Sequence, residues 1–201
     1  MPIYLGSTNI KGIYVGSTKI KEAYIGEDAV YKSELYIIKD GVIADGFSET
    51  EPYSNSSVFP RCASDSGYWG YEQTSTHGTM TTHYRASVYI MADLSGYSNL
   101  HVTCEYDSTK TDKNGGISGD VAFIATKTPY TFSAASGAIN GLTTNADTIC
   151  WIGGLDSSAE SEQTYTFSTN ISEIRALQLA VYAYNRTFSG YNIKIKDVWV
   201  D

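Results

Sequence analysis

Short apolar runs alternate with glycine- and serine-containing breaks at a fixed spacing of ten residues over the first 32 positions. Residues 3–12 are I-Y-L-G-S-T-N-I-K-G and residues 13–22 are I-Y-V-G-S-T-K-I-K-E, so seven of ten positions are identical. A looser third copy occupies residues 23–32. β-Branched and aromatic residues favour strands, whereas Gly-Ser steps favour turns. The pattern predicts a small up-and-down β-meander over residues 1–32.

Neither face of this meander is cleanly polar, because its apolar residues alternate onto both sides. A meander of this size is marginally stable alone, and apolar faces with open strand edges favour association. We therefore expect residues 1–32 to be an attachment or oligomerisation module of a homo-oligomer. The alternative is that they cover the rest of their own chain. The residues expected at assembly contacts are Tyr4, Ile13, Tyr14, Val15, Tyr24 and Ile25.

Residues 33–201 carry strand patterns separated by polar loops. Two apolar runs flank Lys39-Asp40-Gly41, which is typical of a hairpin. Helix signals are nearly absent, and residues 45–82 show no clear periodicity. The chain is therefore predicted to be all-β, with a jelly-roll-type β-sandwich as its second domain. Further strands are expected over residues 84–91, 100–106, 121–125, 148–152, 164–167, 176–183 and 191–200.

Composition narrows the class of protein. Hydrophobic residues make up 42% of the chain, enough for a packed core, and the net charge of −8 argues against nucleic acid or an anionic membrane as a partner. We expect no membrane span and no secretory signal, because no apolar run of 18 residues and no charged leader occur. Cys62, Cys104 and Cys150 are odd in number and lack C-x-x-C spacing, so we expect reduced, mostly buried thiols.

No metal or cofactor is expected. The three histidines, His77, His83 and His101, are spread along the chain, whereas a zinc site needs three or four converging ligands. Residues 112–116 have the start of a calcium-loop pattern, but the twelfth position is Phe123 rather than glutamate. A solvated turn is the better interpretation of that segment.

No catalytic residue is predicted either. The motifs G-x-S-x-G, S-x-x-K and H-E-x-x-H do not occur in the sequence. Several acidic residues could supply the carboxyl pair of a glycan depolymerase, but such a pair is defined by its separation in space. These candidates are Asp65, Glu72, Asp156, Glu160 and Glu162.

One aromatic segment is the best candidate ligand site. Tyr68, Trp69 and Tyr71 lie among glycines in the stretch without strand periodicity, and His77 follows. Aromatic rings stack on sugars while neighbouring polar groups bond the hydroxyls, so we expect these four residues to bind a glycan. The alternative is that the rings close the open end of the sandwich or belong to a strand. Trp151 and Trp199 lie in apolar strands and are expected in the core.

Two stretches are similar to known proteins. The tandem I-Y-[VL]-G-S-T-x-I-K pattern of residues 3–32 resembles short repeats at the start of tail and other minor virion proteins of bacteriophages that infect Gram-positive gut bacteria. Residues 89–100, together with residues 193–199, look like the jelly-roll modules of phage appendages and carbohydrate-binding proteins.

These resemblances imply a virion structural protein, made in the bacterial host cytoplasm and placed in a tail appendage or a capsid-surface fibre. Residues 1–32 would contact other virion proteins, the homo-oligomer would be a trimer, and the jelly roll would face outward to bind host cell-wall glycan. The alternative function is a stand-alone carbohydrate-binding module of a bacterial surface or secreted protein. That module would be a monomer with a concave aromatic site.

Overall fold

The structure of the protein is a computed structural model. It describes the backbone of residues 4–5, 8–9, 14–15, 18–19, 22–25, 28–50, 53–54, 67–73, 76–77, 83–107, 119–129, 145–153, 160–184, 187–188 and 191–201. Side chains are described over residues 33–50, 67–70, 87–106, 121–129, 145–153, 160–180 and 193–201. Within these ranges the chain is nearly all β, with one 3-10 turn, η1 (Ile171–Glu173).

Each copy of the ten-residue repeat forms a hairpin of its own. Strand β1 (Tyr4–Leu5) pairs with β2 (Thr8–Asn9), β3 (Tyr14–Val15) with β4 (Thr18–Lys19), and β5 (Glu22–Ile25) with β6 (Asp28–Lys32). In the described residues we find three separate two-stranded sheets where we expected one continuous meander.

The sequence of the repeat explains this difference. In each copy the two paired strands are separated by two residues, Gly-Ser, Gly-Ser or Gly-Glu. A two-residue loop with glycine first suits a tight hairpin turn, so the chain reverses inside each repeat rather than between repeats. The side chains of the six predicted assembly residues lie outside the described residues.

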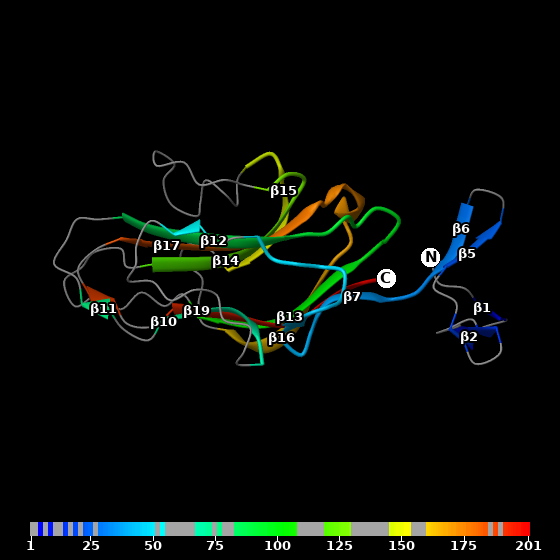
Figure 1. Ribbon diagram of the computed structural model, residues 1–201, viewed down its shortest axis with the longest axis horizontal. Coiled ribbons are helices and arrows are strands. Elements are labelled where there is room, and N and C mark those ends of the chain that lie inside the picture. Colours follow the sequence, from blue (N-terminus) through cyan, green and yellow to red (C-terminus); the bar gives the residue numbers. More distant parts are fainter. Residues whose placement is uncertain are drawn as a thin grey trace.

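Two antiparallel sheets follow, and they form the two layers in Figure 1. The first sheet has the order β16 (Glu160–Phe167), β13 (Leu100–Asp107), β19 (Tyr191–Val200), β7 (Leu35–Lys39) and β8 (Val42–Ile43). The second sheet has the order β15 (Thr148–Gly153), β14 (Gly119–Thr126), β17 (Ala176–Tyr184), β12 (His83–Met91) and β9 (Tyr53–Ser54). A short pair, β11 (Thr76–His77) with β18 (Thr187–Phe188), is separate from both.

The path of the chain confirms the jelly-roll-type sandwich. From β12 in the second sheet the chain crosses to β13 in the first sheet and returns to β14 and β15 in the second. It then crosses to β16, back to β17, and finally to β19 beside β13. Strands adjacent in sequence therefore lie mostly in opposite sheets, as in two interlocked Greek keys.

One edge of β19 is shared by two strands. β7 pairs with the last residues of β19, Val198 to Val200, and β10 (Trp69–Gln73) pairs with residues 191–195 of the same edge. The backbone N–H of Gly41 donates to the carbonyl of Lys196 between them, at 2.7 Å. β10 lies within the stretch where the sequence showed no clear periodicity.

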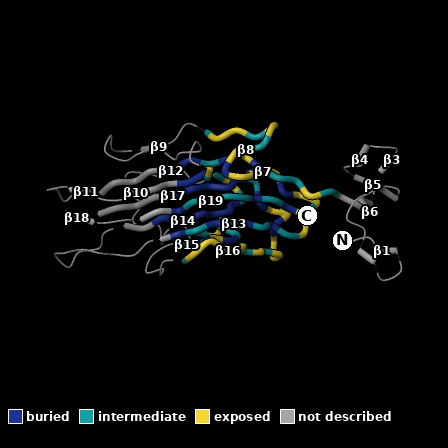
Figure 2. Tube along the Cα trace, turned by 90° about the horizontal axis from the view of Figure 1, so that it is seen from below, coloured by how far each residue is buried: buried dark blue, intermediate teal, exposed yellow. Residues whose placement is uncertain are grey.

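The core lies between the two sheets and is built by strand alternation. In the strands expected over residues 176–183 and 191–200, alternate residues are fully buried, namely Leu177, Leu179, Ile193 and Ile195, and so is Val198. Buried residues run along the middle of the facing strands in Figure 2. The two cysteines that the structure describes are reduced and buried, as expected, and Cys62 lies outside the described residues.

Candidate functional site

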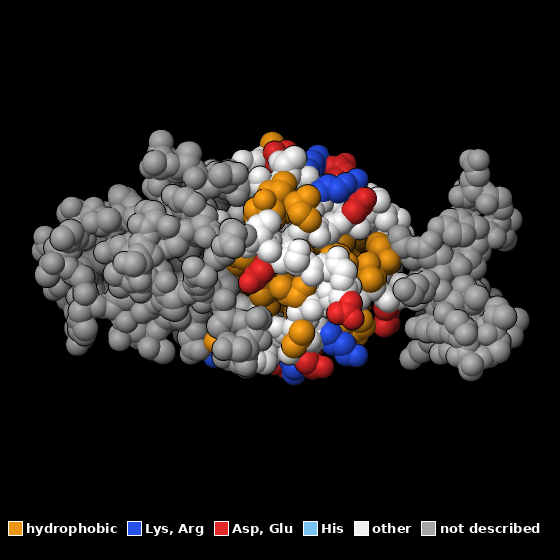
Figure 3. All heavy atoms as spheres, viewed as in Figure 1, with side chains coloured by type: hydrophobic (Ala, Val, Ile, Leu, Met, Phe, Trp, Pro, Cys, Tyr) orange, Lys and Arg blue, Asp and Glu red, His pale blue; other side chains and the backbone are white. Residues whose placement is uncertain are grey.

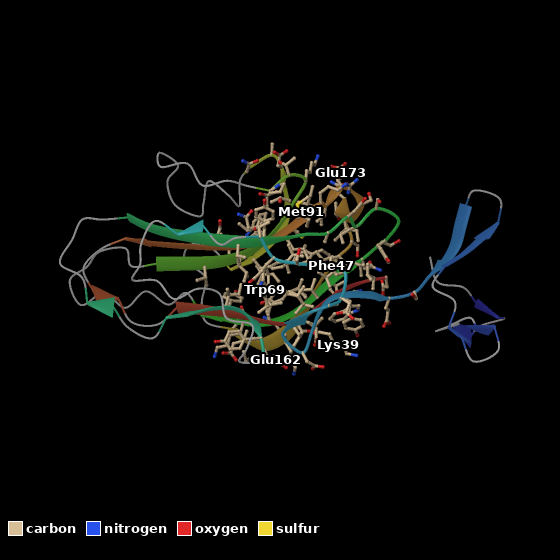
Figure 4. All side chains as sticks on the ribbon, viewed as in Figure 1. Lys39, Phe47, Trp69, Met91, Glu162 and Glu173 are labelled. Atoms are coloured by element: carbon tan, nitrogen blue, oxygen red, sulfur yellow. The ribbon has the colours of Figure 1, made fainter. Side chains whose placement is uncertain are left out.

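Trp69 was the centre of the predicted glycan site, and the structure places it in the core instead. It lies on β10 opposite Ile195, its side chain is 0% exposed, and its Nε1–H donates to Glu49 Oε2 at 3.0 Å. Figure 4 shows Trp69 between the two sheets. The alternative that this aromatic segment contains a strand is therefore correct, and Trp69 offers no ring face to a ligand.

The other members of the predicted site are only partly described. Tyr68 is half-buried at the start of β10, and the Lys194 Nζ lies 5.6 Å from the centre of its ring. Tyr71 pairs with Ile193 on β10, and His77 belongs to β11. The side chains of Tyr71 and His77 lie outside the described residues, so their part in a glycan site stays a prediction.

The two tryptophans expected in the core face outward. Trp151 is 48% exposed on β15, where its neighbours Cys150 and Ile152 are buried. Trp199 is half-buried between the fully buried Val198 and Val200. Successive residues of a strand point to opposite faces, so both expectations were wrong for the same reason. An apolar run does not place every member of the run inside.

Trp199 belongs to a row of side chains that crosses the outer face of the first sheet. Tyr36 of β7, Trp199 of β19, His101 of β13 and Thr166 of β16 are paired in register on four adjacent strands. The ring centroids of Tyr36 and Trp199 are 5.8 Å apart with an interplanar angle of 18°. Those of Trp199 and His101 are 4.8 Å apart at 13°. We call these four residues the aromatic row.

A hydrogen-bonded polar cluster lies at the His101 end of the aromatic row. His101 Nδ1 is 3.0 Å from Thr166 Oγ1, and His101 Nε2 is 3.3 Å from Asp201 Oδ2, an ion-pair distance without hydrogen-bond geometry. Asn99 Nδ2 donates to Asp201 Oδ1 at 2.6 Å, and Ser168 Oγ donates to Asn99 Oδ1 at 2.6 Å. These groups fix the orientation of the imidazole and leave donors and acceptors near the surface.

The Tyr36 end of the aromatic row is surrounded by charge. Burial, followed by the carboxylates of Glu34, Asp197 and Asp40, raises the pKa of the Tyr36 hydroxyl. The hydroxyl is therefore neutral at physiological pH and can both donate and accept a hydrogen bond. Lys39 Nζ lies 5.2 Å from the centre of the Tyr36 ring.

Farther along the same face, charges are paired across strands. Lys194 Nζ is 3.3 Å from Glu105 Oε1, and Lys196 Nζ is 3.2 Å from Glu162 Oε1. Figure 4 shows Lys39 and Glu162 on the outer side of the first sheet. These exposed pairs contribute little to stability, about 0–1 kcal/mol each. Their main effect is to neutralise Lys194 and Lys196 on this face.

The outer face of the second sheet differs. Ala122, Ile124, Gln178 and Ala180 alternate away from the core, yet each is at most 1% exposed, so the centre of that face is not open. Met91 and Trp151 are exposed at its margins. Figure 3 views the sandwich from the side, with the two layers of Figure 1 above and below, and its described charged side chains lie mainly at the upper and lower margins with hydrophobic ones between them. The open, polar and aromatic sheet face is that of the first sheet.

The described side chains give no support to a catalytic or metal centre. They contain no cluster of three or more histidine, cysteine, aspartate or glutamate residues able to hold a metal ion. Burial raises the pKa of the Cys104 and Cys150 thiols to about 12, so neither is a thiolate nucleophile at neutral pH. Glu162 pairs with Lys196 as above, and Glu160 accepts a hydrogen bond from Gln163. The side chains of Asp65, Glu72 and Asp156, and residues 112–116, lie outside the described residues.

The residues of the aromatic row were not identified as a site from the sequence. Tyr36, His101 and Trp199 come from three distant segments, and only the strand register brings them together. A usable signal did exist, because His101 and Trp199 each sit between two buried aliphatic residues and must therefore face outward.

Two further observations concern partners and relatives. Within the described residues, no helix is long and apolar enough to cross a membrane. A comparison of the sequence with models of protein families finds no match, and a comparison with curated proteins finds none.

Proposed function

We propose that this chain is a non-catalytic structural protein of a bacteriophage virion, located in a tail appendage or a capsid-surface fibre. Residues 1–32 attach it to the assembly and hold it in a homo-oligomer, a trimer being the favoured state. Residues 33–201 present a jelly roll that binds a glycan of the host cell wall.

The glycan-binding half of the proposal rests on one observation, the open outer face of the first sheet. Tyr36, Trp199 and His101 are partly exposed there, and Thr164 and Thr166 are exposed beside them. Binding sites for sugars combine aromatic rings with a few fixed hydrogen-bonding groups. The aromatic row and its polar cluster supply both kinds of group on one surface.

The attachment half is supported by the repeats. Their pattern resembles that of phage virion proteins, and in the described residues each hairpin pairs only within itself. Two- to five-residue strands in isolated hairpins are marginal in water. Association with other copies or other virion proteins would stabilise them.

The oligomeric state tests the attachment half. Size-exclusion chromatography with light scattering should give an oligomer for the full chain and a monomer after deletion of residues 1–32. An antibody against the chain should label purified virions at one structural position. A full-length monomer, or a deleted protein that keeps its oligomeric state, would contradict the assembly role.

Binding to cells tests the glycan half. The labelled full-length protein should bind Gram-positive gut bacteria and their isolated wall glycans saturably, and it should release no reducing ends from them. Release of reducing ends would indicate a depolymerase instead. Absence of binding to every strain and glycan would leave a purely structural virion role.

The same open face also suits the alternative, a stand-alone carbohydrate-binding module of a bacterial surface or secreted protein. The two functions differ in assembly, because the module would bind glycan as a monomer. Glycan binding by a full-length monomer that is absent from virions would favour this alternative.

A further inference from the structure

The three rings of the aromatic row stand upright on the sheet. Side chains project roughly perpendicular to a sheet, and Tyr36, Trp199 and His101 stack nearly parallel across neighbouring strands, at 5.8 and 4.8 Å. Their faces are therefore turned toward one another, and Lys39 lies over the remaining side of Tyr36. The three rings therefore expose their edges, rather than their faces, to solvent.

Ring edges favour a ligand with many hydroxyl groups. The edge of an aromatic ring carries positive partial charge, and these rings also carry the Tyr36 hydroxyl and the Trp199 indole N–H. The His101 nitrogens are not offered to a ligand, because Nδ1 is bonded to Thr166 Oγ1 and Nε2 is buried. Thr166 adds a hydroxyl at the end of the row. A purely apolar ligand would need exposed ring faces, whereas a sugar can bond to several edges at once.

The charges near the row select against an anionic ligand. Glu34, Asp40 and Asp197 all act electrostatically on Tyr36, and the Asp201 carboxylate lies beside His101 at the other end. Lys39 is the cation in contact with the row among the described side chains. Four carboxylates around one ammonium group give a negative local potential, which repels phosphate and uronate groups.

The length of the row favours a chain of sugars over a single ring. Four strands at a spacing of about 4.8 Å place Thr166 roughly 14 Å from Tyr36. Each member is the paired partner of the next on adjacent strands, although the β7–β19 ladder has a register shift between Val198 and Trp199. A ligand that contacts the whole row must cross the strands at a right angle.

Building on the proposed function, we propose that the aromatic row and the polar cluster beside it, formed by Asn99, Ser168 and Asp201, are the glycan site. The site binds an uncharged oligosaccharide that lies across β7, β19, β13 and β16. The segment around Trp69 then supports the fold and does not contact the sugar.

The test measures binding of neutral and anionic wall oligosaccharides to the full-length protein and to matched variants. Trp199→Ala removes the centre of the row, and Thr166→Arg covers its exposed end without touching the core. Trp151→Ala is the control, an exposed tryptophan on the other sheet. Each variant is first checked for an unchanged far-UV circular dichroism spectrum and oligomeric state.

We expect Trp199→Ala and Thr166→Arg each to weaken binding of a neutral oligosaccharide by about tenfold or more, equivalent to ~1.4 kcal/mol. Trp151→Ala should bind as the wild type does. A neutral ligand should also change the tryptophan fluorescence of the wild type, and this change should disappear in Trp199→Phe. Thr166→Arg answers the question even if Trp199→Ala fails to fold.

Two outcomes would overturn the site while leaving the proposed function intact. The first is glycan binding that survives Thr166→Arg and is lost in Trp151→Ala, which would move the site to the second sheet. The second is binding of anionic glycans alone, which would refute the ligand class. Failure of the wild type to bind any glycan or cell would instead refute the glycan half of the proposed function.

Discussion

Replacement of Trp69 by alanine should destabilise the protein more than replacement of either of the other two tryptophans. Trp69 is 0% exposed and is the largest fully buried side chain of the described core. Truncation of a buried tryptophan costs about 3–5 kcal/mol. Since small domains have a total stability of about 5–15 kcal/mol, Trp69→Ala should remove about a fifth of it or more.

Part of the stability lost in Trp69→Ala comes from the hydrogen bond of the indole N–H, and this part can be measured separately. Its partner Glu49 is exposed, so the carboxylate can be rehydrated when the donor is removed. Trp69→Phe keeps most of the ring and loses the bond, which should cost about 2 kcal/mol. Glu49→Gln keeps an acceptor and should cost about 1 kcal/mol or less.

The assay is urea unfolding at neutral pH followed by far-UV circular dichroism, because changing a tryptophan would confuse a fluorescence signal. Trp151→Ala is the matched control and should cost under about 1 kcal/mol, since Trp151 is 48% exposed. A free energy of unfolding for Trp69→Ala within about 1 kcal/mol of the wild type would refute the burial of Trp69. Loss of glycan binding in Trp69→Ala would reflect unfolding rather than a lost contact.

Two further predictions concern buried thiols and a tight turn. Cys104 and Cys150 should react with a thiol reagent at pH 8 only after denaturation, as mass spectrometry of the labelled peptides can show. Burial raises the pKa of both thiols to about 12, whereas the thiols of the unfolded chain ionise near pH 9. The free energy of unfolding should therefore fall as the pH rises above about 9. Fast labelling of the native protein, or a free energy of unfolding that stays constant above pH 9, would contradict this. Gly41→Ala should lower the free energy of unfolding in urea by about 1–3 kcal/mol more than Gly46→Ala does. Both glycines have a positive φ, but only at Gly41 would an added Cβ collide with backbone, since it would lie 2.1 Å from the Tyr68 nitrogen. Equal losses in the two glycine variants would show that the neighbouring backbone moves away at no cost.

Much of the fold could be predicted from the sequence because strand alternation is a local signal. The strands expected over residues 100–106, 121–125 and 176–183 are present, and in the last of them Leu177 and Leu179 alternate into the core. β10 was missed because its residues include Gly70, which has no side chain to continue the alternation. Gly70 is needed there, since a Cβ would lie 2.0 Å from the carbonyl oxygen of Ile193.

The candidate site could not be predicted in the same way. The sequence drew attention to residues 66–72 because aromatic residues are close together there, yet Trp69 is buried. The aromatic row instead depends on pairing between strands that are far apart in the sequence. Knowing that Trp199 lies opposite both Tyr36 and His101 requires the order of strands in the sheet, which a single sequence does not contain.

The shared edge of β19 has a consequence for how the protein can vary. After Gly41, whose N–H still donates to Lys196, the chain leaves this edge, and it returns to the same edge at Trp69, the start of β10. β7 and β10 each pair with β19 on their own, so the register of the sheet does not depend on how many residues connect these two strands. An insertion in the chain between β9 and β10 should therefore leave β7 and β10 paired with the same residues of β19.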